Sequence, residues 1–258
     1  MTSFVPVPLP STSALNDAYV KSQLTKWDLH RNLKCVAVRY TKYYHKLQGQ
    51  ELLADLFRDE KVQEAFQVLR KGGSWGPLGG PVTKVDATLL ASSLTRTDIF
   101  DKLTETSPPI VRSNGDIGKC MEDNRDGFQI SDLLREMILA GDDSVNACLY
   151  SDAERDELLW RLFEHVVLGG SCCQYEDKVE PYVETSKRLY KELVCAQKDT
   201  ASGKVQTVSA VYKVNSIQGE AGPLELFPSR SRQNFCYAAV DPVRRIVKIL
   251  YHAYVPYW

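Results

Sequence analysis

Residues 235–254 read FCYAAVDPVRRIVKILYHAY, two apolar runs separated by a short polar turn. The runs, residues 235–240 and 246–254, are rich in the β-branched and aromatic residues that strands favour. Asp241 and Pro242 are typical of a turn, because proline presets its own backbone dihedral and aspartate bonds the backbone that follows it. The stretch therefore predicts an antiparallel β-hairpin near the end of the chain.

Three other stretches predict strands. Residues 205–214, VQTVSAVYKV, alternate in the way of a half-buried strand, and residues 34–44 are β-branched and aromatic. Residues 4–9 contain prolines that remove backbone donors, which confines them to an edge strand or an arm. Helical periodicity and capping residues predict helices at residues 14–29, 50–57, from Asp59 onward, 96–104, after Ser131 or Asp132, 154–168 and 181–194.

The order of these elements, strands then helices then strands without regular alternation, indicates an α+β fold. We expect an antiparallel sheet that includes the C-terminal β-hairpin and packs against several helices. We expect residues 1–258 to form a single α+β domain. A candidate lobe boundary lies near residues 113–126, which are polar and interrupted by glycine.

The central block, residues 168–194, reads LGGSCCQYEDKVEPYVETSKRLYKELV. Ser151 and Glu154 have the spacing of a capping box for the preceding helix, glycines end that helix, and Pro181 opens the next one. The polar connection between two rigid helices is the kind of position where binding residues occur; an ordinary helix–helix loop is the alternative. The candidate partner-binding residues are Gly169, Gly170, Gln174, Tyr175, Glu176 and Asp177.

A glycine-rich stretch, KGGSWGPLGGP at residues 71–81, is a second candidate partner surface. It is not a phosphate-binding loop, because such a loop has a lysine and a serine or threonine directly after its last glycine, whereas Pro81 and Val82 follow Gly80. We expect these glycines to shape a tight strand-to-strand connection around Trp75.

The overall charge excludes long-range attraction to nucleic acid or to an anionic membrane, because 32 Lys and Arg residues balance 33 Asp and Glu residues. Basic residues near the predicted hairpin turn, Arg244 and Arg245 among them, are expected to be a solvated turn rather than an RNA site. No run of about 18 apolar residues predicts a membrane span. Seven scattered cysteines are typical of free thiols in a reducing compartment. We therefore expect a cytoplasmic protein without nucleic-acid or membrane partners.

Motifs for chemistry are weak. Residues 122–133 fail as a calcium loop, because Leu133 stands where a bidentate glutamate should close the site. A thiol nucleophile with an imidazole base is conceivable, formed by Cys172 or Cys173 together with His165 or His252. Each histidine, however, lies in a predicted helix or strand, where a structural role is commoner. No zinc spacing, phosphate-binding loop or hydrolase motif occurs. We expect no enzymatic activity, no metal and no cofactor.

Four segments resemble the cilia- and flagella-associated protein 300 family in the order of that family. They are LFRDEKVQEAFQVL (56–69), FQISDLLREMIL (128–139), the central block (168–194) and VDPVRRIVKILYHAY (240–254). The resemblance implies a non-catalytic adaptor or co-chaperone-like factor for assembly of axonemal outer and inner dynein arms, with a link to intraflagellar transport. It implies axonemal dynein subunits and dynein assembly factors as partners, and cytoplasm and cilium as locations. Two alternatives stay open: a structural axonemal protein carried by intraflagellar transport, and a cysteine-dependent enzyme using Cys172 or Cys173.

Overall fold

The computed structural model describes residues 3–45, 48–140, 144, 146–200 and 203–256. Its main sheet has the strand order β1, β2, β13, β12, β10, and both β5 and β11 pair with β10. All these pairs are antiparallel. The strands are β1 (Phe4–Val7), β2 (Leu33–Tyr40), β5 (Val82–Leu90), β10 (Ala210–Gly219), β11 (Gly222–Leu224), β12 (Phe235–Asp241) and β13 (Ile246–His252). The predicted α+β fold with an antiparallel sheet is confirmed, and β1 is an edge strand.

The predicted C-terminal hairpin is present as β12–β13, and it lies at the centre of this sheet. The Asp241 carboxylate accepts hydrogen bonds from the backbone N–H groups of Val243 (2.9 Å) and Arg244 (3.0 Å), which closes the turn. All seven residues of β12 are buried. This explains its continuous apolar run, because a strand covered on both faces has no solvent side to alternate with.

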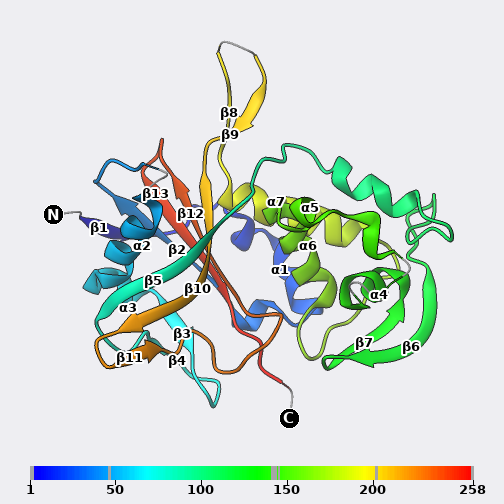
Figure 1. Cartoon of the computed structure of the whole chain (residues 1–258), viewed down its shortest axis with the longest axis horizontal. Coiled ribbons are helices and arrows are strands. Elements are labelled where there is room, and N and C mark those ends of the chain that lie inside the picture. Colours follow the sequence, from blue (N-terminus) through cyan, green and yellow to red (C-terminus); the bar gives the residue numbers. More distant parts are fainter. Residues whose placement is uncertain (1–2, 46–47, 141–143, 145, 201–202, 257–258) are drawn as a thin grey trace.

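Helices cover both faces of the sheet (Figure 1). The apolar cluster of the first face includes α1 (Ala18–Lys26), α6 (Leu158–Leu168) and α7 (Glu180–Leu193), with α4 (Leu133–Ala140) packed against α6. The second face packs against α2 (Gly49–Arg58) and α3 (Glu60–Ala65). Successive side chains of β12 alternate between the two apolar clusters: Tyr237 and Ala239 join the first, whereas Cys236 and Ala238 join the second. That the whole chain is one domain stays a prediction.

Two predicted helices are shorter than their periodicity suggested. The helix expected at residues 14–29 begins at Ala18, because the Asp17 carboxylate caps it by accepting the Val20 N–H at 3.0 Å. The helix expected at 154–168 is divided into α5 (Asp152–Arg155) and α6. Glu157 between them is extended, and its carboxylate accepts the backbone N–H of Ser93 at 3.1 Å. A contact from a distant segment thus interrupts the helical pattern.

The predicted capping box is present, but it caps the short α5 rather than the long helix. The Ser151 hydroxyl accepts the Glu154 N–H at 3.3 Å, and the Glu154 carboxylate accepts the Ser151 N–H at 3.0 Å. We expect Ser151→Ala to lower the free energy of unfolding by about 1 kcal/mol, because it leaves a helix N–H without its acceptor. Urea denaturation measures this, with Ser151→Thr, which keeps a hydroxyl, as the control. Equal losses in the two variants would contradict the capping role.

Several short strands were not predicted. β6 (Lys119–Arg125) and β7 (Phe128–Asp132) form a separate hairpin where the sequence suggested an irregular segment and, after it, a helix. Asp126 (φ 52°) and Gly127 (φ 82°) form its turn, so the acidic run 123–127 lies on a hairpin. Within the glycine-rich stretch, β4 (Trp75–Pro77) pairs with β3 (Gln67–Leu69), which lies just before the stretch, so the stretch is in part a strand itself.

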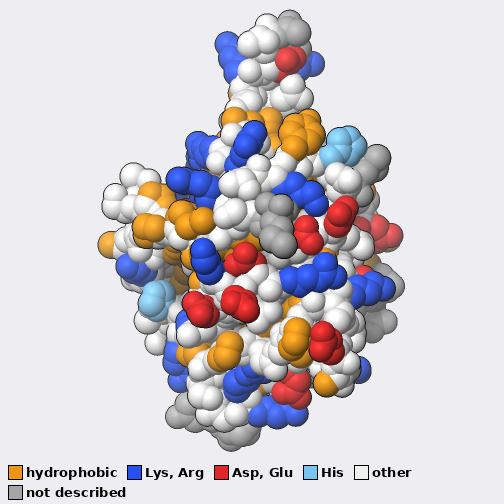
Figure 2. All heavy atoms as spheres, turned by 90° about the vertical axis from the view of Figure 1, so that its left-hand side faces the viewer, with side chains coloured by type: hydrophobic (Ala, Val, Ile, Leu, Met, Phe, Trp, Pro, Cys, Tyr) orange, Lys and Arg blue, Asp and Glu red, His pale blue; other side chains and the backbone are white. Residues whose placement is uncertain are grey.

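The strand expected at residues 205–214 is interrupted after Thr207. Its first part, β9 (Val205–Thr207), pairs with β8 (Ala196–Lys198) in a hairpin that projects from the body (Figure 1), and β10 starts at Ala210. Figure 2 shows the same projection above a face on which basic and acidic side chains are interspersed. None of the helices in the described ranges has the length and apolarity that crossing a bilayer requires.

Candidate functional site

The connection that follows α6, residues 169–177, begins with two glycines that lie against the C-terminal end of α1. Gly169 has a φ of +64° and ends α6, as predicted. The Gly170 N–H donates to the carbonyl oxygen of Trp27 at 2.7 Å. A Cβ on Gly170 would collide with the carbonyl oxygen of Asp28. Both glycines are therefore required for close packing of backbone against backbone.

Asp28 fixes the next part of the connection. Its carboxylate accepts hydrogen bonds from the Ser171 hydroxyl and from the Cys172 N–H, each at 3.1 Å. The Gln174 N–H donates to the Lys26 carbonyl oxygen at 3.0 Å. Four polar contacts, from residues 170, 171, 172 and 174, thus fix the connection along the end of α1.

A buried ion pair anchors Tyr175. The Arg135 guanidinium lies 3.3 Å from the centroid of the Tyr175 ring and forms an ion pair with the Asp132 carboxylate. Arg135 also donates to the Tyr182 hydroxyl at 3.0 Å, and this hydroxyl accepts the Glu176 N–H at 2.9 Å. Because Asp132 is 0% and Arg135 1% exposed, the pair is shielded from solvent.

Glu176 and Asp177 differ in exposure. The Glu176 side chain is 11% exposed; its carboxylate accepts the Trp27 indole N–H at 3.1 Å and pairs with Lys26 at 2.7 Å. The Asp177 side chain is 86% exposed and pairs with Lys119 at 2.7 Å, and the hydrogen bond from Lys119 lowers the pKa of Asp177. Of the six predicted residues, only Gln174 and Asp177 are fully accessible to a partner.

The other four predicted residues hold the connection in place. Their supports, Asp28, Arg135 and Tyr182, were not predicted. Arg135 stands three residues after the capping Asp132, a spacing that allows a local ion pair. Asp28 had no such signal, because its role depends on a φ of 54° and on a segment more than 140 residues away.

The glycine-rich stretch lies on the other face of the sheet. Trp75 packs against the second apolar cluster, and its ring centroid lies 5.9 Å from that of Tyr251. The Lys34 ammonium lies 3.8 Å from the centroid of the Trp75 ring. Gly72 and Gly73 have positive φ, and an added Cβ would meet nothing within 4 Å. The tip of this loop is therefore accessible, whereas its tryptophan is part of the packing.

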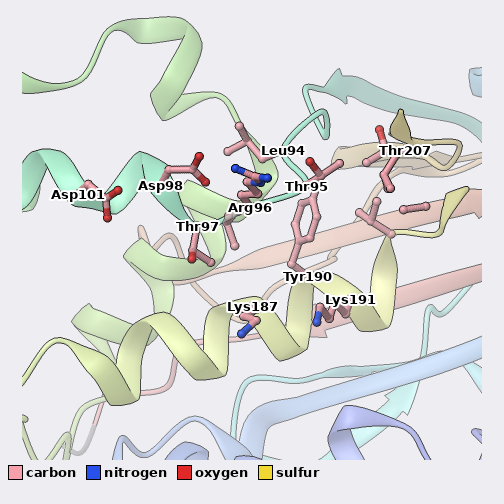
Figure 3. Close-up of a pocket in the computed structure, with 14 residues that line it drawn as sticks. Leu94, Thr95, Arg96, Thr97, Asp98, Asp101, Lys187, Tyr190, Lys191 and Thr207 are labelled. Atoms are coloured by element: carbon pink, nitrogen blue, oxygen red, sulfur yellow. The ribbon is translucent and has the colours of Figure 1, made fainter. Parts of the chain in front are cut away.

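A groove of about 690 Å³ lies along the second half of α7, at the base of the β8–β9 hairpin (Figure 3). The segment 94–101 forms the opposite wall, and Tyr190 extends from α7 towards Thr95. Arg96 and Lys191 line the groove, and within the described ranges neither has a hydrogen bond or ion pair through its side chain. No sequence pattern identified this groove, because three segments far apart in the chain form it.

The cysteines and histidines considered for nucleophilic chemistry are not arranged as nucleophile and base in the described part of the chain. Burial raises the pKa of Cys173 to about 12, while Cys172 is exposed. His165 donates from Nδ1 to the Gln233 side chain at 2.9 Å and accepts from the Tyr237 hydroxyl at 2.8 Å. Across the described part of the chain, no hydrogen bond joins a histidine to either thiol, and no three His, Cys, Asp or Glu side chains group as metal ligands.

Burial also lowers the pKa of His165 to about 4, from an ordinary value of 6.5. Between these pH values the unfolded chain binds a proton that the folded chain does not, so stability falls as the pH is lowered from 6.5 towards 4. We expect this group to contribute on the order of 3 kcal/mol of that loss. Urea denaturation at several pH values measures it, and His165→Gln should show a shallower dependence. Identical pH profiles would contradict the assignment.

Comparison with known proteins is consistent with the resemblance and extends it to the start of the chain. The family model described as "Cilia- and flagella-associated protein 300" matches residues 1–252. The chain is 89% identical to the protein of that name from Chlamydomonas reinhardtii over 258 residues, 100% of both chains. It is 29% identical to that from Paramecium tetraurelia over 244 residues, which are 95% of this chain and 91% of the relative. No solved structure matches. The chain belongs to the cilia- and flagella-associated protein 300 family.

Proposed function

We propose that this protein is a non-catalytic factor for the assembly of axonemal outer and inner dynein arms. It acts in the cytoplasm as an adaptor or co-chaperone-like binding protein before the arms enter the cilium, and intraflagellar transport carries its cargo. Membership in a family associated with cilia and flagella is the observation that carries the proposal.

The geometry of the connection supports a binding role. Residues 169–177 are fixed by α1, Arg135 and Tyr182 before any partner arrives, so little conformational entropy is lost on binding. Gln174 and Asp177 project from this fixed backbone into solvent. The partners proposed for this surface are axonemal dynein subunits or the assembly factors that handle them.

The α7 groove is a second surface for the same partners. Arg96 and Lys191 lie on opposite walls without ion-pair partners among the described residues, which suits an acidic segment of a dynein subunit or assembly factor. Asp98 and Asp101 line the same wall as Arg96, so the acidic group is expected at the Arg96–Lys191 end of the groove.

The test is affinity purification of the tagged protein from the cytoplasm of ciliating cells after removal of their cilia, followed by mass spectrometry. Enrichment of axonemal dynein chains together with chaperone-type assembly factors supports the proposal. Recovery of axonemal proteins alone, with the tagged protein retained in detergent-extracted axonemes, favours the structural alternative instead.

Surface variants locate the contact. We expect Gln174→Arg combined with Asp177→Lys to reduce dynein recovery roughly tenfold, because it reverses the charge of the exposed part of the connection. Arg96→Glu tests the groove in the same way. Glu220→Lys, which reverses an exposed carboxylate between β10 and β11, is the matched control. Unchanged recovery in both test variants would remove both surfaces from the proposal.

A further inference from the structure

A second cavity, of about 380 Å³, lies between α6, the strands β10 and β12, and residues 231–234. It shares no residue with the connection or with the α7 groove. Its walls carry four cations and two carboxylates: Arg155, Arg161, Lys213, Arg232, Asp156 and Glu164. Cations therefore outnumber carboxylates in a confined space.

The two carboxylates are already engaged. Asp156 pairs with Arg161 at 2.5 Å, and Glu164 pairs with Arg232 at 2.7 Å. This leaves two cations without a carboxylate. The Arg155 side chain donates only to backbone carbonyl oxygens, and the Lys213 side chain has no hydrogen bond or ion pair within the described ranges.

Lys213 and Arg161 are both short of acceptors. Lys213 projects from the sheet and is half-buried. Burial and the positive charge of Arg161 lower its pKa, and the charges of Glu164 and Asp156 offset this only in part. The Nε–H of Arg161 is buried, and it has no acceptor among the described residues. The positive charges of Lys213 and Arg161 also lower the pKa of His165, which lines the same cavity. A buried donor without an acceptor and two neighbouring cations are each unfavourable until an anion enters.

Neutral donors complete the wall. The Ser231 hydroxyl oxygen accepts the Gln233 N–H at 3.2 Å, which leaves the hydroxyl hydrogen free to donate. Donors thus come from a helix (Arg161), a strand (Lys213) and a loop (Ser231). A tetrahedral anion with several oxygens matches such a set better than a planar carboxylate does.

We propose that this cavity binds a small molecule through a phosphate group, with Lys213 and Arg161 as its principal ligands. The volume is within the range of small-molecule sites. The proposal is independent of the dynein-arm role, because it rests on other residues.

Titration calorimetry of the full-length protein tests it, with inorganic phosphate, glycerol 3-phosphate and AMP as probes and chloride at equal ionic strength as the reference. We expect saturable binding of at least one phosphate probe and a loss of about tenfold in affinity for Lys213→Met, which removes the unpaired charge and keeps an apolar stem. The control is Lys84→Met, the same change at an exposed lysine of β5. Tighter binding of inorganic phosphate than of both esters identifies free phosphate as the ligand, and preference for an ester identifies a phosphorylated metabolite.

Three outcomes would overturn the proposal: no saturable binding of any phosphate probe, an unchanged affinity in Lys213→Met, or an equal loss in Lys84→Met. The last result would show general attraction to basic residues rather than a site. Circular dichroism of Lys213→Met establishes that the variant is folded before its affinity is interpreted.

Discussion

Gly170→Ala is expected to lower the free energy of unfolding by about 3 kcal/mol, although it adds a single methyl group. The added Cβ would collide with the backbone carbonyl of Asp28, which cannot rotate away as a side chain would. The Gly170 N–H donates to the Trp27 carbonyl oxygen at 2.7 Å, and this bond holds the two backbone segments close together. Either that bond is broken, which leaves two backbone polar groups without partners, or the end of α1 moves and loses its packing. Urea denaturation followed by circular dichroism measures the loss.

The matched control is Gly80→Ala in the glycine-rich stretch. There the nearest heavy atom to a new Cβ is a Leu224 methyl carbon at 3.4 Å, an ordinary contact, so the change should be small. Hydrogen exchange adds a local reading: in Gly170→Ala the amides of Cys172 and Gln174 should lose protection, because their acceptors lie on the displaced end of α1. Equal stability of the two variants would show that the connection adapts without cost.

The sheet was predictable because its signals are local. The hairpin is encoded within twenty residues, by two apolar runs and an Asp-Pro turn, and nothing distant is needed to recognise it. The break at Asp17 has a local signal, because aspartate is a favoured N-cap residue and its carboxylate accepts an N–H three residues later. The break at Glu157 has no such signal, because it depends on the bond to Ser93, which the sequence pattern does not contain.

The β6–β7 hairpin was missed for a different reason. β6 is mostly exposed, so its residues show no alternation between buried and exposed positions, and the periodicity that identifies strands is absent. The turn at Asp126 and Gly127 is a local signal, but an acidic run before a glycine is also typical of a calcium loop, so the pattern alone does not indicate a hairpin.

The candidate site was predicted in part. The glycines at 169 and 170 follow from a helix-ending rule, which needs only neighbouring residues. The sequence marks Tyr175 and Glu176 only as polar residues of a connection. Their contacts are with Arg135 and Trp27, which lie too far away along the chain for a local pattern to indicate. A sequence locates such a connection, whereas only the structure separates the residues that support it from those that a partner can reach.

Arg135→Met is expected to have the largest effect, a loss of about 4 kcal/mol, because it leaves the Asp132 carboxylate buried without its partner. It also removes the cation from the Tyr175 ring and the donor to the Tyr182 hydroxyl, so the connection loses its anchor. Urea denaturation measures the loss. Lys119→Met, which breaks the exposed pair with Asp177, is the control and should leave the free energy of unfolding nearly unchanged, because solvent screens that pair.

A double variant separates the charge from the packing. Asp132→Asn keeps an oxygen that accepts the Arg135 N–H, now observed at 2.9 Å from the carboxylate, so the cap of α4 survives while the charge is removed. If the cost of Arg135→Met comes mainly from the stranded carboxylate, Asp132→Asn combined with Arg135→Met should be more stable than Arg135→Met alone. If the double variant is no more stable, the stacking on Tyr175 and the bond to Tyr182 carry the energy instead. In that case the connection depends on Arg135 as a packing group, and its hydrogen-exchange protection should fall equally in both variants.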